Sequence, residues 1–250
     1  MRISDSDFGM LKPFYAAVLD LLFPPLCHVC RRFISTAGEL HICPGCRELM
    51  SPIISPKCTI CGIPFIGAGA DHICGACSTS APHFDSARAA LVYEGASRNL
   101  IHAFKYRNKT HLRRPLALLA MEMLSEFIQS RRPDLIMPVP LHRNKLSSRG
   151  FNQAVLLGEI LSQRLMIPLD RRNLRRIRWT EPQVNLAVLD RRTTVKGAFA
   201  IQDTAQVNGR RVLLVDDVLT TGSTAEECGK VLKSAGAADV TVITVARALV

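Results

Sequence analysis

Two adjacent carboxylates and a short hydroxyl-rich loop near the end of the chain carry the clearest chemical signal. Asp216 and Asp217 follow an apolar run at residues 212–215. The loop comes shortly after them: Thr220, Thr221, Gly222, Ser223 and Thr224. Carboxylates suit the hydroxyls of a ribose or a hydrated Mg²⁺, and a glycine loop before a helix start suits a phosphate. The stretch therefore predicts a cradle for a ribose 5-phosphate.

Two other interpretations of this stretch are available. The first is an ordinary strand, turn and helix in which Ser or Thr only caps the helix. The second is the acidic strand end of a nucleotide hydrolase. That enzyme class needs a G-x-x-x-x-G-K-[ST] loop for its triphosphate, and the 250 residues contain none.

A group of cations follows another apolar segment, at residues 135–139, which is typical of a short buried strand. The residues after it that matter are Pro140, His142, Arg143, Lys145 and Arg149. Cations at the carboxyl end of a parallel strand lie at the crevice where open α/β sheets bind ligands. Asn152 is then a suitable N-cap for a helix that runs to about residue 165.

Eight of the nine cysteines form four C-x-x-C pairs between residues 27 and 77. The second half repeats the first with a constant shift, which predicts two tetrahedral thiolate zinc sites. The expected sets are Cys27, Cys30, Cys43 and Cys46, and then Cys58, Cys61, Cys74 and Cys77. Spacing alone also permits crossed pairing of the four knuckles. Disulfides or a redox pair are the alternatives, but a chain without a signal peptide stays reduced, and a redox C-x-x-C is not duplicated.

Isolated Cys and His residues in and beyond this region have simpler interpretations. His28, His41 and His72 are superfluous as ligands beside four thiolates, so we expect them at the surface. Cys228 lies in the helix that follows the phosphate loop, and we expect it to be a core thiol.

The elements that must position these groups alternate along the chain. Strands are expected at residues 87–93, 135–139, 198–201, 211–215 and 240–245, with a basic strand candidate at 169–177. Helices are expected at 97–110, 116–128, 152–165 and 225–235. Such alternation predicts an α/β fold with a parallel sheet. The predicted units are an amphipathic helix within 1–26, a zinc unit at 27–77, a linker at 78–84 and the α/β domain at 85–250.

Charge and hydropathy narrow the functional class. The formal net charge is +11, and residues 98–211 hold 22 Lys and Arg against 8 Asp and Glu. Within this region Lys105, Arg107 and Lys109 are interleaved with Phe104 and Tyr106, a pattern that can stack bases and neutralise phosphates. An amphipathic helix with a basic end explains the same pattern equally well.

No apolar run is long enough to span a membrane, and residues 10–25 lack a signal-peptide pattern, so we expect a cytoplasmic protein.

The first motif, with its apolar run, Asp-Asp and Thr-Thr-Gly-Ser-Thr, resembles the signature of type I phosphoribosyltransferases. The cation motif, P-V-P-L-H-R…R-G-F-N-Q, resembles the ComF family, which also begins with a cysteine-rich zinc ribbon. Residues 183–199 resemble a loop of that family, although Thr194 stands where Asn is usual. The resemblance implies a double zinc ribbon followed by a Rossmann-like phosphoribosyltransferase domain.

The resemblance also implies a ligand and roles for individual residues. Phosphoribosyl pyrophosphate with Mg²⁺ is the implied ligand, in addition to two structural zinc ions. Asp216 and Asp217 would hold the ribose hydroxyls, and residues 220–224 would hold the 5-phosphate. Pro140 and Arg143 would face the pyrophosphate, and Lys105 and Arg149 add positive charge.

The family is linked to DNA uptake and natural transformation, so single-stranded DNA and the uptake machinery are the implied partners. A DNA-binding or nucleotide-sensing protein without turnover remains the alternative to an enzyme, and the acceptor is unidentified.

Overall fold

A four-stranded parallel sheet forms the centre of the computed structural model, which describes residues 24–35, 38–179 and 195–249. Its strands are β1 (Ser86–Val92), β2 (Leu135–Pro138), β5 (Arg211–Leu219) and β6 (Asp239–Arg247), in the spatial order β1-β6-β5-β2. The two central strands are buried along most of their length, because helices cover a parallel sheet on both faces. The predicted strands in these four places are confirmed.

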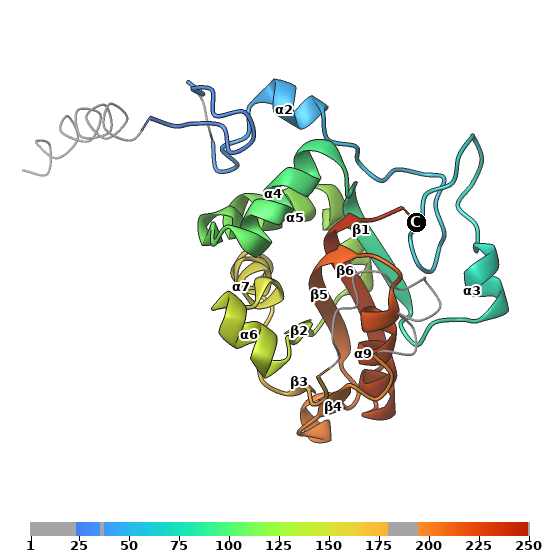
Figure 1. Cartoon of the computed structure of the whole chain (residues 1–250). Helices are drawn as coiled ribbons and strands as arrows, with labels where there is room; N and C mark the ends of the chain where they lie inside the picture. Colours follow the sequence, from blue (N-terminus) through green and yellow to red (C-terminus); the bar gives the residue numbers. More distant parts are fainter. Residues whose placement is uncertain (1–23, 36–37, 180–194, 250) are drawn as a thin grey trace, which may run out of the picture.

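Helices cover the two faces of this sheet (Figure 1). One face packs against α4 (Gly95–Tyr106), α5 (Arg113–Arg131) and α7 (Gln153–Leu165), with a core that includes Phe104, Leu119 and Leu213. The other face packs against α9 (Ser223–Ser234). Its core includes Cys228, which is fully buried, as the sequence predicted. Asn152 caps α7 by accepting a hydrogen bond from the Ala154 backbone N–H at 3.0 Å, which was also expected.

The two remaining strands lie outside the parallel sheet. β3 (Leu174–Arg176) and β4 (Phe199–Ile201) form a separate antiparallel ribbon, so the prediction that residues 198–201 belong to the parallel sheet is wrong. Of the basic strand expected at 169–177, only the three residues of β3 are a strand in the structure. Apolar content identifies a strand, but packing chooses its partner: Leu174 and Phe199 are buried in the α9-side core instead of at a sheet edge.

Short helices complete the described part of the chain. They are α2 (Pro44–Glu48), α3 (Gly75–Thr79), α6 (Arg143–Arg149) and the 3₁₀ turns Thr110–Leu112 and Thr204–Gln206. Across these described ranges, no helix has both the length and the apolar character that crossing a bilayer requires. The amphipathic helix predicted at 10–25 and most of the loop predicted at 183–199 lie outside the described residues.

Candidate functional site

Asp217 is the better buried of the two carboxylates on β5. Its residue exposure is 5%, and one carboxylate oxygen lies 2.8 Å from the Nζ of Lys105, near the end of α4. Burial lowers the pKa of Lys105, but the attraction of Asp217 outweighs that effect and the net pKa is raised. Lys105 and Asp217, which are far apart in the sequence, therefore form a largely buried ion pair.

Asp216 lies next to this pair in a different electrostatic setting. Its Oδ1 accepts a hydrogen bond from the Asp217 backbone N–H at 2.9 Å. Burial, and then the negative charge of Asp217, raises the pKa of Asp216 to about 7. The carboxyl of Asp216 therefore changes protonation near neutral pH, whereas an approaching cation would favour its charged form.

β5 does not end at the two carboxylates, as the sequence suggested, but continues to Leu219. Asp216 pairs in register with Thr244 of β6, and Leu219 pairs with Arg247. The strand continues because Val218 and Leu219 extend the apolar pattern and pack into the two cores. The carboxylates are consequently held by strand backbone, which orients them more firmly than a loop would.

The loop at residues 220–224 connects β5 to α9. Gly222 is the N-cap of α9 with φ +81°, a backbone conformation that side chains with a Cβ rarely adopt. The hydroxyls of Thr221 and Ser223 are 2.8 Å apart, and Thr220 is exposed. Hydroxyls and free N–H groups at a helix N-terminus are the donors that phosphate needs.

Two glutamates follow this loop, and both are engaged elsewhere. Glu226 accepts a hydrogen bond from the His83 backbone N–H at 2.8 Å and pairs with the His83 ring. Glu227 accepts a hydrogen bond from the Gly197 backbone N–H at 2.8 Å. These contacts fix both carboxylates in place beside the start of α9.

Beside the Lys105–Asp217 pair lies a basic cavity of about 500 Å³. It is lined by Lys105, Tyr106, Asn108, Lys145, Ser148, Arg149 and Trp179. The guanidinium of Arg149 lies 5.1 Å from the centre of the Tyr106 ring and donates to Gln153 Oε1 at 2.7 Å. Burial, and then the charge of Arg149, lowers the pKa of Lys145. The structure thus brings Lys105 and Arg149 together, as the sequence proposed.

Arg143 and Pro140 line a neighbouring cavity of about 550 Å³. His142 lines this cavity, and its ring lies 5.0 Å from the Trp179 ring of the basic cavity. Arg171, Arg172, Arg175 and Arg176 add further positive charge. The predicted pyrophosphate residues Arg143 and Pro140 therefore lie in one basic cavity, and the predicted cations Lys105 and Arg149 lie in the adjoining one.

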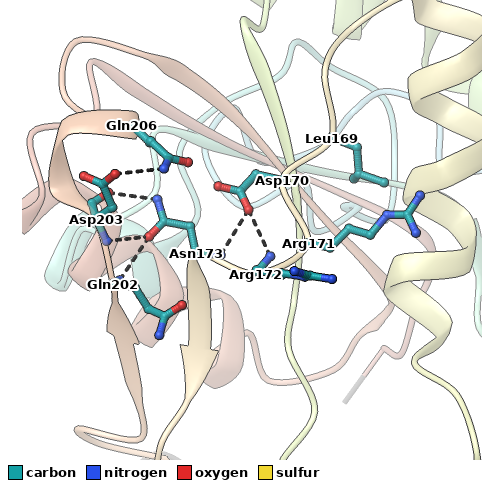
Figure 2. Close-up of a pocket in the computed structure, with 8 residues that line it drawn as sticks. All are labelled: Leu169, Asp170, Arg171, Arg172, Asn173, Gln202, Asp203 and Gln206. Atoms are coloured by element: carbon teal, nitrogen blue, oxygen red, sulfur yellow. Dashed lines mark hydrogen bonds between the residues drawn. The ribbon is translucent and has the colours of Figure 1, made fainter.

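A further cavity, of about 520 Å³, contains none of the predicted site residues (Figure 2). The polar groups around it largely satisfy one another. Asn173 donates to the Asp203 backbone carbonyl at 2.8 Å, and Gln206 donates to the Asp203 carboxylate at 2.8 Å. We assign no ligand to this cavity.

The eight paired cysteines form the two sets that the sequence predicted, without crossing. Within each set the four sulfurs all lie within 4.8 Å of one another. Cys30 and Cys43 sulfurs are 3.7 Å apart, and Cys61 and Cys74 sulfurs are 3.8 Å apart. A tetrahedron with Zn–S bonds of about 2.3 Å places its sulfurs about 3.8 Å apart, so both sets fit a structural zinc ion. Four thiolates leave no open coordination position.

The histidines near the sulfur clusters are less uniform than we expected. His72 is exposed, but His28 and His41 are half-buried, so the surface prediction is wrong for these two. The ring of His28 lies 5.6 Å from that of His41 and 5.3 Å from that of His111. Sequence spacing cannot reveal such a group, because His111 comes from the turn before α5.

Trp179 and Arg247 were absent from the predicted site, and Tyr106 and Lys145 were noted in its motifs without a role of their own. Lys145 and Tyr106 had a usable signal, since both lie inside the predicted cation motifs. Trp179 and Arg247 had none: each reaches its cavity only through packing of distant segments.

Known protein families match two separate parts of the chain. A double zinc ribbon domain matches residues 18–78, and a phosphoribosyl transferase domain matches residues 152–249. These matches, the parallel sheet and the two Cys₄ clusters confirm the predicted architecture, a double zinc ribbon with a type I phosphoribosyltransferase fold.

Individual proteins are similar to this chain over different shares of its length. Competence protein F of Haemophilus influenzae is 36% identical over 226 residues, covering 87% of this chain and 97% of that protein. DNA utilization protein YhgH of Escherichia coli O157:H7 is 37% identical and covers 60% of this chain and 66% of that protein. A solved adenine phosphoribosyltransferase from Saccharomyces cerevisiae is 19% identical, covers 58% of this chain and 72% of that chain, and has a TM-score of 0.36. We base nothing on a structural likeness of that size.

Proposed function

The chain belongs to the ComF family, and from that premise we propose that it binds phosphoribosyl pyrophosphate with Mg²⁺ and serves in DNA uptake. The observation that carries the proposal is the carboxylate pair of β5 directly before a glycine loop at the start of α9. We also propose the domain boundaries predicted from the sequence: a zinc unit at 27–77, a linker at 78–84 and the transferase domain from residue 85.

The ribose and its 5-phosphate would be held by consecutive parts of one strand, loop and helix. Asp216 and Asp217 accept hydrogen bonds from the two ribose hydroxyls. The hydroxyls of Thr221 and Ser223, together with the N–H groups at the start of α9, bind the 5-phosphate. Thr220, Gly222 and Thr224 shape the same loop. For the ribose to engage Asp217, its hydroxyl must share that carboxylate with Lys105, at 2.8 Å.

The pyrophosphate would lie toward the basic cavities, where Pro140 and Arg143 are joined by Lys105 and Arg149. Mg²⁺, when bound, would supply the charge that stabilises pyrophosphate as a leaving group. The protein's own residues orient the ligand and supply fixed positive charge beside the pyrophosphate. The carboxylates of Asp216 and Asp217 stabilise the positive charge that develops on the sugar. In an enzyme of this kind the acceptor would attack the anomeric carbon.

Calorimetric titration of the zinc-loaded protein with Mg²⁺ and phosphoribosyl pyrophosphate tests the proposal. Asp216→Asn and Asp217→Asn should each weaken binding roughly ten- to a hundredfold, because each removes a charged hydrogen bond. Asp203→Asn, the same chemical change in the cavity of Figure 2, is the matched control and should bind as the wild type does. Unchanged affinity in both site variants would refute the ribose assignment. Release of pyrophosphate in the presence of candidate acceptors would then separate an enzyme from a binding protein.

Binding of single-stranded DNA is a second candidate function, favoured by the basic cavity. Tyr106 is 63% exposed and Trp179 is 39% exposed, with Lys145 and Arg149 beside them. Exposed rings among cations can stack bases while neutralising phosphates. Arg107 and Lys109 extend the positive charge beyond the end of α4.

The salt dependence of oligothymidylate binding tests this second function. Arg149→Ala should reduce the slope of log K against log salt by about 0.7, the value for one phosphate contact. Tyr106→Ala should lower the affinity and leave the slope unchanged, because stacking releases no counterion. Arg132→Ala, after α5, is the control for loss of charge alone. No binding at low salt would remove this candidate.

A further inference from the structure

The two zinc ribbons dock differently, although the sequence repeats one as the other. In the first, Glu39 forms ion pairs with Arg114 of α5 at 2.6 Å and Arg164 of α7 at 2.5 Å, through side chains that are about half exposed. The second lies along the edge strand β1, where the Ala87 backbone N–H donates to the Ile60 carbonyl at 2.7 Å. The second ribbon therefore packs along the sheet edge at β1, whereas the first contacts the helices α5 and α7.

A cavity of about 330 Å³ lies between this second ribbon and the phosphate loop. The loop contributes Thr221, Gly222 and Ser223, and the ribbon contributes Ile63 and Ala76 among others. The described residues that line it do not include Asp216, Asp217 or Lys105. The cavity therefore shares the phosphate loop with the ribose site but not its carboxylates, so a ligand that occupies both would be joined at the phosphate.

The walls of the cavity suit an uncharged flat ring more than a second anion. Ile63, Pro82, Phe84 and Leu219 give it apolar surface. Two glutamates line it, and the sulfur cluster of the second ribbon adjoins it, so a second phosphate would be repelled.

One buried cation lines the same cavity. Arg247 is 8% exposed and donates to the Cys61 carbonyl at 2.6 Å, and its Nε has no hydrogen-bond partner among the described residues. Arg247 thus places a guanidinium at the cavity wall, and the carbonyl of a ring is a suitable acceptor for such a group.

We propose that this cavity receives the nucleobase of a nucleotide joined through the phosphate that the loop holds. The ligand class is a nucleoside phosphodiester, whose ribose lies over Asp216 and Asp217 and whose preceding base lies against Phe84 and Ile63. The inference rests on the proposed function, because the loop must hold a phosphate. It adds that the second ribbon contacts the ligand and that the first does not.

Calorimetry with two uridine probes that carry the same charge tests the proposal. The first is the methyl ester of uridine 5′-phosphate, and the second is uridylyl-(3′→5′)-uridine, which adds one nucleoside beyond the same phosphodiester. The wild type should bind the dinucleotide about tenfold more tightly, an effect within the range of stacking one base. Ala76→Phe places a ring in the cavity from α3 and should abolish this preference while leaving the methyl ester affinity unchanged.

Gly45→Phe is the matched control, since Gly45 is the counterpart of Ala76 in the first ribbon and has open space around it. It should retain the tenfold preference. Ser80→Phe, which enters the cavity from the residue after α3, provides the same test if Ala76→Phe does not fold.

The outcomes separate this inference from the proposed function. Equal affinity of the wild type for both probes overturns the inference, and so does a preference that survives filling of the cavity. In either case binding of Mg²⁺ and phosphoribosyl pyrophosphate would leave the proposed function intact. Failure of the wild type to bind phosphoribosyl pyrophosphate and both probes refutes the proposed function itself.

Discussion

Replacement of the two neighbouring aspartates by Asn should change the free energy of unfolding in opposite directions. Asp217 is paired with Lys105, whose side chain is 18% exposed. Asp217→Asn leaves that ammonium group without its partner, and losing such a charged hydrogen bond costs about 1.5–3 kcal/mol. We therefore expect a destabilisation of about 2 kcal/mol, since Lys105 also borders the basic cavity and can regain some water there.

Asp216→Asn should instead stabilise the protein at alkaline pH. The folded-state pKa of Asp216 is raised to about 7 by burial and by Asp217, against an ordinary value of 3.8. Between these two values the unfolded chain has lost the proton that the folded chain keeps, so the free energy of unfolding falls as pH rises and levels off above about 7. A shift of this size is worth up to about 4 kcal/mol. Asn cannot ionise and should remove this loss.

Urea unfolding of the zinc-loaded protein at pH 5 and pH 8, followed by circular dichroism, measures both effects. Asp216→Asn should be more stable than the wild type at both pH values, with a larger gain at pH 8, because only roughly a third of the loss is present at pH 5. Asp217→Asn should be less stable at both pH values, and adding Lys105→Met should recover part of the loss, because the unpaired charge is then gone. The raised pKa of Asp216 would be refuted if Asp216→Asn destabilised the protein at pH 8. It would also be refuted if the free energy of unfolding depended on pH in the variant as it does in the wild type. A neutral Asp217→Asn would show that the ion pair contributes nothing.

Two further predictions concern the zinc ribbons. Metal analysis of carefully prepared protein should find about two zinc ions per chain, and a chelator should unfold the ribbons while the sheet domain keeps its circular dichroism; intact thiols without zinc would contradict this. Gly62→Ala should loosen the second ribbon from β1, because a Cβ there would lie 2.4 Å from the Ala87 carbonyl oxygen and Gly62 has φ +71°. Proteolysis between residues 58 and 84 should then be faster than in the wild type. The control Gly45→Ala, with open space around it, should be cleaved at the wild-type rate.

The amino-acid sequence by itself determined the features that depend on short stretches of chain. Four C-x-x-C turns at a repeated spacing identify the sulfur ligands, because each turn aims two sulfurs at one metal. The Asp-Asp pair and the glycine loop are only two residues apart in the sequence, so their proximity needs no tertiary contact. The alternation of apolar strands and amphipathic helices likewise predicted the layered α/β fold.

Contacts between distant segments were decided only by the tertiary structure. The Lys105–Asp217 ion pair forms because α4 packs on the face of the sheet toward which Asp217 points. The pKa of Asp216 rises because β5 continues past it and the surrounding elements remove water. Nothing in the duplicated cysteine pattern distinguishes the two ribbons, yet among the residues that the structure describes it is the second that borders the phosphate loop. Burial and docking depend on how whole elements pack against one another, and local spacing carries no information about that packing.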